Sequence, residues 1–402
     1  PLMSKCNITK KKLDAFMTFG EMPLANGFLK KKDFKKEKFY NLDIGFNEKI
    51  SLFQVLGVPK FSNIVYKNYP FFTNKSTYMI KHFKKCAKWI KDNFLDFKSN
   101  LIEIGSNDGT MIKNFNNSSI NAIGVDPAPN VTSFARKNGV KTYNIFFNSK
   151  NINKLKKYYK NTKVIYAANV FCHIKDLIDV IKCVDYLLSS DGYFIFEEPY
   201  LGSMYKNISY DQLYDEHIYM FSATSILKIF QLYDFELIDI QSQITHGGSV
   251  RYIISRKNKN PIKKNVNKFL KYEDLKNISN IEGCLKFKND CEMSRELILN
   301  KIKKLKEKNK SICGYAATAK STTVLNYCGV GKELIDCIYD TSEEKIGKYS
   351  PGMHIPILPM KDFKKSNFDY AYLFAWNHKQ EIFAKEKKFK KKGGKWLCHV
   401  KI

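Results

Sequence analysis

The alternation of short apolar segments with helical segments between residues 100 and 200 constrains the fold more than any other feature of this sequence. The segments NLIEIGS, NAIGVDP, KTYNIFF, KVIYAANV and GYFIFEEP predict five successive strands. Strands that alternate with helices predict a mainly parallel sheet covered on both faces. We therefore expect an α/β protein.

The 402-residue length predicts two or three domains. Apolar residues at helical spacing predict a helix over 74–97, directly before the first strand. Residues 257–272 are rich in Lys and Asn and are typical of a linker. Further strands are predicted at SICGYAA, LIDCIYD and DYAYLFAW. We expect three units, at 1–73, 74–257 and 258–402.

The formal charge of +29 would suit a nucleic-acid or membrane ligand. However, only four basic residues are arginine, the residue best suited to phosphate and guanine, and no basic run lies in a recognisable nucleic-acid module. The sequence also has no run of about 18 apolar residues, and its start lacks the apolar segment of a secretory signal. We expect a cytoplasmic protein that binds neither nucleic acid nor a membrane.

The segment Leu101–Gly109, LIEIGSNDG, predicts a strand followed by a glycine turn. Glycine lets the backbone approach a ligand closely. Asp126 ends the next strand, where an acidic residue suits a ribose diol. The G-x-G-x-x-G pattern of dinucleotide enzymes is absent, and Glu103 favours a cationic ligand without phosphate, such as S-adenosylmethionine. The alternative is a βαβ unit with a tight turn and no ligand.

Three further motifs follow strands, where open α/β sheets bind their ligands. Asn169 and His173 follow the fourth strand, and YDEHIYMFS, which contains His217, follows the fifth. A histidine beside carboxylates and tyrosines can act as a general base near neutral pH. The alternatives are a structural histidine and a helix start with stabilising acids. THGGSVR places a flexible turn beside the rare Arg251, which predicts an anion or substrate contact or else a β-bulge.

These motifs, in this order, resemble the three-domain sugar C-methyltransferases that depend on S-adenosylmethionine. The resemblance covers nearly the whole chain and includes GEMPLANGF, LIEIGSNDG, VDPA, NVFCHI, YDEHIYMFS, THGGSVR, GYAATAK and PGMHIP. It implies a Rossmann-like cofactor domain between a small N-terminal domain and a C-terminal α/β domain that binds a nucleotide-linked sugar. The implied reaction removes a proton next to a ketone of a keto-deoxysugar and methylates that carbon. The implied carrier of the sugar is thymidine diphosphate.

The resemblance also assigns roles to residues of this chain. His217 is the implied base, and Tyr69 matches an aromatic residue near the substrate, although Phe71 stands where a second tyrosine is usual. The cofactor-binding residues are Glu103, Gly105, Asn107, Asp126, Pro127 and Asn169. The residues of the catalytic group are His217, Tyr214, Glu216, His173 and Tyr69. The substrate-binding residues are His246, Gly247, Arg251, Tyr315 and Lys320.

The chain departs from the family in its N-terminal domain, which usually holds zinc through two C-x-x-C pairs. Cys6 is retained, but Thr9, Asn47 and Ile50 occupy the other three positions. Structural zinc sites need four Cys or His ligands, so we expect no zinc and no other metal. The ten scattered cysteines are expected to be reduced thiols.

Two other functions are compatible with the sequence. The charge suits a methyltransferase that acts on RNA or protein, and the lost zinc ligands suit a non-catalytic protein that binds sugar nucleotides. Calorimetry with S-adenosylmethionine and then thymidine diphosphate separates them, because only the sugar C-methyltransferase should bind both. We expect this enzyme to be a monomer.

Overall fold

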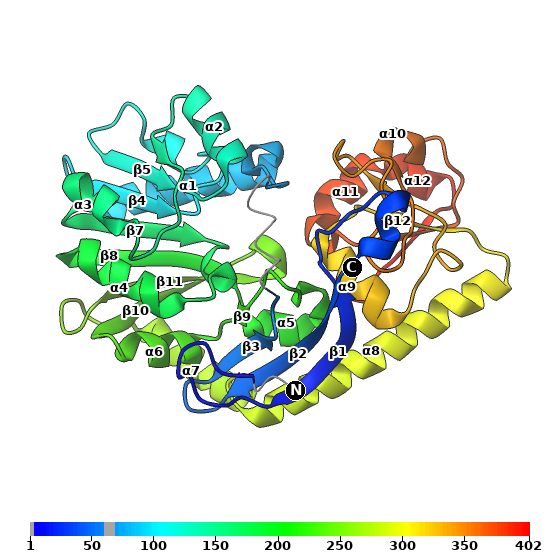
Figure 1. The fold of residues 1–402 in the computed structure, drawn as a ribbon, viewed down its shortest axis with the longest axis horizontal. Helices are drawn as coiled ribbons and strands as arrows, with labels where there is room; N and C mark the ends of the chain where they lie inside the picture. The colour runs from blue at the N-terminus through cyan, green and yellow to red at the C-terminus, as the bar shows by residue number, and fades with distance from the viewer. Residues whose placement is uncertain (1–3, 60–68) are drawn as a thin grey trace.

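The computed structural model describes residues 4–59 and 69–402, apart from the side chain of Tyr158, and contains three sheets arranged in two lobes joined by a smaller layer (Figure 1). The strands are β1 (Ala15–Pro23), β2 (Phe39–Asn47), β3 (Leu52–Leu56), β4 (Asn100–Ile104), β5 (Asn121–Val125), β6 (Thr142–Tyr143), β7 (Thr162–Ala168), β8 (Leu188–Pro199), β9 (Tyr219–Met220), β10 (Phe235–Gln243), β11 (Ser249–Arg256), β12 (Ile312–Tyr315), β13 (Ile338–Asp340), β14 (Ile357–Pro359), β15 (Tyr370–Leu373) and β16 (Lys395–Leu397). The helices are α1 (Thr77–Phe94), α2 (Pro129–Lys137), α3 (Ile152–Tyr159), α4 (Leu177–Leu187), α5 (Leu201–Asn207), α6 (Ala223–Gln231), α7 (Lys264–Leu275), α8 (Ile281–Glu307), α9 (Ala319–Cys328), α10 (Met360–Phe363), α11 (Lys379–Lys385) and α12 (Lys387–Lys391).

The first lobe is built on a seven-stranded sheet with the order β6-β5-β4-β7-β8-β11-β10. The strands from β6 to β8 are parallel, and β11 and β10 add an antiparallel edge. The chain passes outward from β4 through β5 to β6 and then returns to β7 on the other side of β4. This reversal creates a topological switch point between β4 and β7, the place where such sheets bind ligands.

The second lobe repeats this principle in a smaller form. Its five parallel strands have the order β14-β13-β12-β15-β16, so the reversal lies between β12 and β15. Helix α9 follows β12 and starts with a capping box, in which Thr318 and Ser321 bond reciprocally to each other's backbone amides. The two lobes therefore each present one switch point, and the predicted α/β class is confirmed.

The N-terminal layer is a four-stranded antiparallel sheet with the order β1-β2-β3-β9. Its last strand, β9, comes from the middle of the chain, beyond the range 1–73 expected for this unit. The linker expected over 257–272 instead contains helix α7, which packs on the first lobe through buried Val266. Helix α8 runs along the underside of the molecule from one lobe to the other (Figure 1).

Apolar periodicity explains the helices that cover the sheets. Helix α1 buries Met79, Phe83, Ala87 and Ile90, which recur at helical spacing, and Ser76 caps it by accepting from the amide of Met79. Within the described residues, no helix combines the length and the apolar character that crossing a bilayer requires.

Candidate active site

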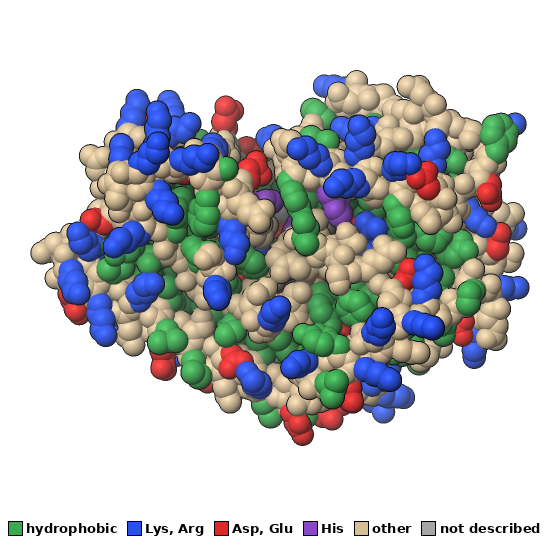
Figure 2. All heavy atoms as spheres, turned by 180° about the vertical axis from the view of Figure 1, so that it is seen from behind, with side chains coloured by type: hydrophobic (Ala, Val, Ile, Leu, Met, Phe, Trp, Pro, Cys, Tyr) green, Lys and Arg blue, Asp and Glu red, His purple; other side chains and the backbone are tan. Residues whose placement is uncertain are grey.

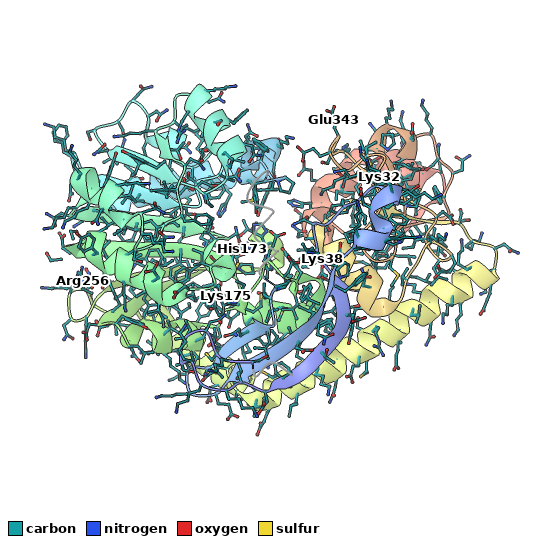
Figure 3. The ribbon with its side chains drawn as sticks, in the orientation of Figure 1. Lys32, Lys38, His173, Lys175, Arg256 and Glu343 are labelled. Carbon is teal, nitrogen blue, oxygen red and sulfur yellow. The ribbon has the colours of Figure 1, made fainter. Side chains whose placement is uncertain are left out.

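The switch points of the two lobes face each other across the middle of the molecule. Segment η7 (Thr245–Gly247), which precedes β11, meets η8 (Trp376–His378), which follows β15. The contact is so close that a Cβ on Gly247 would lie 2.2 Å from an indole carbon of Trp376. Figure 2 shows histidine side chains in the hollow between the lobes, and Figure 3 shows His173 near the centre of the molecule. A ligand at either switch point therefore reaches the same interdomain space.

The turn after β4 lies at the switch point of the first lobe, where open α/β sheets bind their ligands. We call this place the first crevice, and the corresponding place in the second lobe the second crevice. Gly105 has a φ of +68°, and a Cβ there would lie 2.1 Å from a methyl carbon of Val170. Glycine is needed for both reasons, because other residues rarely adopt this φ and their side chains would collide. Asn169 also has a positive φ, of 54°, at the end of β7. The two ends of the switch point are thus in direct contact.

Unpartnered acceptor atoms give this crevice its chemistry. Among the described residues, Glu103 Oε2 and Asn169 Oδ1 are buried without a hydrogen-bond partner. Burial, followed by the charges of Asp108 and Asp126, raises the pKa of Glu103 well above its ordinary value. A cationic ligand would reverse this effect and satisfy the free oxygens. The crevice therefore fits S-adenosylmethionine, which carries a sulfonium and an ammonium group.

Asp126 directly follows β5 beside this crevice. Its carboxylate accepts hydrogen bonds from the backbone amides of Asn107 and Ala128, each at 2.9 Å, and Pro127 follows it in the same turn. Each oxygen keeps a lone pair for a ribose hydroxyl. The side-chain oxygen of Asn107 accepts a hydrogen bond from the amide of Thr73 at 3.2 Å. Asn107 thus contributes its backbone turn, while its side chain anchors the segment that enters α1.

His217 is the best-defined ionisable group of the site. It is 8% exposed, and its Nδ1 lies 2.7 Å from the carbonyl oxygen of Gln212. A carbonyl only accepts, so Nδ1 carries the proton of the neutral ring, and Nε2 accepts from the hydroxyl of Tyr214 at 2.8 Å. Burial, followed by the nearby His173 and then other groups that include Lys320, lowers the pKa of His217 well below its usual value. The imidazole is therefore neutral at pH 7 and can accept a proton.

The other members of the predicted catalytic group surround this imidazole. The rings of His173 and His217 meet edge to face with centroids 4.9 Å apart, and burial lowers the pKa of His173 to about 4. Burial, followed by the charge of Asp215, raises the pKa of Glu216 to about 7. Burial, followed by Glu216, Cys172 and then Tyr69, raises the pKa of Tyr214 well above its ordinary value. The structure thus brings all five predicted catalytic residues together.

The N-terminal layer also contributes to the site, which the sequence analysis had not assigned. The side-chain amide of Asn26 donates to Glu216 at 2.6 Å, and the amide of Ala25 donates to Asp215 at 2.9 Å. The hydroxyl of Thr322 on α9 donates to the carbonyl of Ala25 at 2.8 Å. Residues from the N-terminal layer and from both lobes therefore lie close to His217. The only sequence signal was the GEMPLANGF motif, which contains Ala25 and Asn26 but does not indicate where they pack.

Cys172, His173 and His217 place potential metal-ligand atoms within 4.8 Å of one another. Both ring nitrogens of His217 already face protein groups, and the thiol of Cys172 is buried beside Glu198. Transition-metal sites need free imidazole lone pairs, and in these contacts His217 offers none.

Three of the five predicted substrate-binding residues face the interdomain space. His246 has a φ of 53°, and its Nε2 is buried without a partner within the described part of the chain. Lys320, in the first turn of α9, lies over the ring of Trp376 with its Nζ 4.7 Å from the ring centroid. Burial, followed by the charge of Lys320, lowers the pKa of His246 to about 3. Together with Gly247, they form a wall shared by both lobes.

The two other predicted substrate-binding residues have structural roles, and these predictions are corrected here. Arg251 is buried against Glu197, with Nη2–Oε1 2.6 Å and Nε–Oε1 2.8 Å, and its guanidinium stacks on Trp89. A buried carboxylate needs such a partner, so the rare arginine serves the core of the first lobe. Tyr315 donates to Glu386 at 2.9 Å inside the second lobe. It ends β12, but its side chain is buried in the core.

Comparisons with known proteins agree with this geometry. Residues 78–240 match the family model described as a methyltransferase domain, and residues 244–400 match the model described as the C-methyltransferase C-terminal domain. The chain is 28% identical to the C-methyltransferase NovU of Streptomyces niveus over 387 residues, which cover 96% of this chain and 92% of that protein.

Two similar solved structures each align with about half of this chain. A methyltransferase of Clostridium acetobutylicum is 16% identical and aligns with a TM-score of 0.35 over 50% of this chain and 98% of its own. A protein of Pyrococcus horikoshii is 14% identical, with a TM-score of 0.38 over 50% of this chain and 100% of its own. The two family models and the full-length relative confirm the resemblance: the chain belongs to the C-methyltransferases that depend on S-adenosylmethionine.

Proposed function

We propose that this C-methyltransferase acts on a nucleotide-linked keto-deoxysugar, at the carbon next to the ketone. The observation that carries the proposal is the opposition of the two switch points. The first crevice has acidic and amide acceptors for the cofactor. The second has α9 with the cation of Lys320 in its first turn, a combination that suits a diphosphate. A substrate with a nucleotide at one end and a reactive carbon at the other would span this space.

The residues between the crevices suit proton removal. When bound, S-adenosylmethionine supplies an electrophilic methyl group that a carbanion can take up. In our proposal, the C–H bond next to the ketone breaks as the hydroxyl oxygen of Tyr214 takes the proton. The hydroxyl proton of Tyr214 passes at the same time to Nε2 of His217, 2.8 Å away. The Gln212 carbonyl then stabilises the imidazolium through Nδ1.

The same arrangement assigns roles to the neighbouring histidines. His173 donates one ring N–H to the backbone carbonyl of Glu216, so its other nitrogen is an acceptor in the neutral ring. This nitrogen of the neutral ring has no proton to donate to the enolate oxygen, so that oxygen needs another hydrogen-bond donor. Nε2 of His246 is unpartnered within the described residues, and we assign it to that donor role.

We also propose that the N-terminal layer folds without zinc. The four positions of the lost metal site still come together in the structure. The amide of Thr9 faces Cys6 Sγ at 3.5 Å, Asn47 donates to the Thr9 hydroxyl at 2.9 Å, and Asn47 accepts from the amide of Ile50 at 3.4 Å. Hydrogen bonds and the packing of buried Ile50 thus replace the four bonds that a metal would supply.

The test is mass spectrometry of a panel of nucleotide-linked keto-sugars after incubation with enzyme and S-adenosylmethionine. We expect a mass gain of one methylene group in at least one thymidine-diphosphate sugar, and none in the matching sugars without a ketone. Methylation of RNA or protein by the enzyme, with no gain in any keto-sugar, would refute the proposal. A second test is calorimetry with thymidine diphosphate, which we expect to bind and to lose affinity in Lys320→Ala.

A further inference from the structure

The carbonyl of Gln212 sets the tautomer of His217, and it belongs to a short segment, Tyr210–Leu213, that the second lobe holds at several points. The hydroxyl of Tyr210 lies 3.3 Å from Sγ of Cys328 on α9. The hydroxyl of Thr323, also on α9, donates to the carbonyl of Leu213 at 2.9 Å. Two residues that flank Gln212, Tyr210 and Leu213, are thus held by contacts with helix α9 of the second lobe.

Between these two residues, Asp211 contacts two side chains of the second lobe through its carboxylate. One oxygen accepts from the indole N–H of Trp376 at 2.6 Å, and the other lies 3.3 Å from Nε2 of His399. The side chains of Asp211 and His399 are 1% and 0% exposed, so this carboxylate and imidazole pair without competition from water. Burial opposes the charge on His399, but Asp211 raises its pKa to about 9, which makes the pair ionic at pH 7.

The groups around this pair support the ionic form. Tyr210, Tyr372 and Cys398 also contact His399, and none of these three side chains is a carboxylate or a basic group. Lys320 lies over the ring of Trp376 and adds a favourable charge for Asp211. Asp211 directly precedes Gln212, so fixing its side chain also fixes the orientation of the next carbonyl.

We propose that Asp211 is a positioning residue through which Trp376 and His399 of the second lobe hold the Gln212 carbonyl against His217. The proposal rests on the role of His217 in the proposed function. It makes the base dependent on docking of the lobe that we assign to the nucleotide. The first lobe on its own would bind the cofactor but would leave His217 free to rotate or to change tautomer.

The test compares Asp211→Asn, His399→Gln and Thr323→Val in the full chain, with Glu37→Gln as the matched control. Glu37 also joins a histidine of the second lobe, His354 at 2.7 Å, but from the N-terminal layer and away from Gln212. Nitrogen-15 NMR of histidine-labelled protein reports the tautomer of His217 without any substrate. Steady-state methyl transfer then gives kcat, and calorimetry gives the affinity for S-adenosylmethionine.

We expect the wild type and the Glu37→Gln variant to show a single Nδ1–H tautomer. Asp211→Asn and His399→Gln should show a mixture, a kcat lowered at least about tenfold and unchanged cofactor affinity. An unchanged tautomer in the folded variants would overturn the proposal, even if the rate fell. If Asp211→Asn does not fold, His399→Gln provides the same reading, because it removes the partner of the Asp211 carboxylate and leaves Asp211 itself in place. The NMR result stands if no keto-sugar is methylated, so failure of the proposed function is seen separately.

Discussion

Replacing Gly105 by alanine tests the argument that two strand ends meet without space for a side chain. The added Cβ would lie 2.1 Å from one methyl carbon of Val170 and 2.9 Å from the other, so Val170 must move. A residue other than glycine at a φ of +68° costs roughly 1–2 kcal/mol. Overpacking adds about 1–3 kcal/mol. We therefore expect Gly105→Ala to lower the free energy of unfolding by about 2–5 kcal/mol.

The displacement should also reach the cofactor, because Asn169 directly precedes Val170. We expect the affinity for S-adenosylmethionine to fall at least about tenfold, which corresponds to about 1.4 kcal/mol. Urea unfolding followed by circular dichroism measures the stability, and titration calorimetry measures the binding.

Gly139→Ala is the matched control. Gly139 has a φ of +76° but would place its Cβ with nothing within 4 Å, so only the cost of roughly 1–2 kcal/mol for the backbone applies. The double variant Gly105→Ala with Val170→Ala should recover most of the steric cost. Equal stability of Gly105→Ala and Gly139→Ala, together with unchanged cofactor binding, would refute the close approach of the two strand ends.

Three further predictions address the charges and the metal. Binding of S-adenosylmethionine should tighten as pH rises through the raised pKa of Glu103 and should release a proton, because the cation binds the ionised carboxylate. Glu103→Gln should abolish that proton release. Calorimetry in buffers of different ionisation enthalpy measures the release. His217→Ala and His217→Asn should fold and bind cofactor but lose at least about a hundredfold in kcat. Since the pKa of His217 is lowered, wild-type activity should persist as pH falls through 6.5 and decline only below it, and a half-maximal rate at 6.5 would contradict this. Elemental analysis should find no zinc, and a chelator should leave the Tm unchanged, whereas stoichiometric zinc would show that Cys6 and its neighbours still bind metal.

The sequence predicts the parts of the fold that depend on local periodicity. The five strands from β4 to β8 and the helix before them follow from apolar spacing, and the turn of Gly105 follows from its glycines. Strand β9 could not be predicted, because two residues without a turn signal join a sheet whose other strands lie more than 160 positions earlier. Helix α7 was also not predicted. Its many charged residues are typical of a linker, and the contacts that hold it are made with residues distant in the sequence. In particular, buried Glu273 accepts from the amides of Ala223 and Thr224.

For the site, too, the sequence indicated some residues and could not indicate the roles of others. Residue type and position near the carboxyl end of a strand were enough to select His217, Tyr214 and Glu103 as candidates, because chemistry restricts which side chains can serve. They were not enough for Arg251, whose rarity suggested a ligand until the structure showed Glu197 beside it. A buried charge needs a partner, whether that partner is a substrate or the protein itself, and sequence does not distinguish the two.

The unpartnered atoms supply the distinction that the sequence lacks. Arg251 and Glu197 satisfy each other, whereas Glu103 Oε2, Asn169 Oδ1 and His246 Nε2 are buried without a partner in the described part of the chain. A folded protein rarely leaves such atoms unsatisfied unless another molecule completes them. Two of these atoms lie at the switch point of the first lobe, and the third lies where the lobes meet. Cofactor and substrate binding should therefore satisfy what folding alone leaves open, and this accounts for the concentration of polar groups between the two lobes.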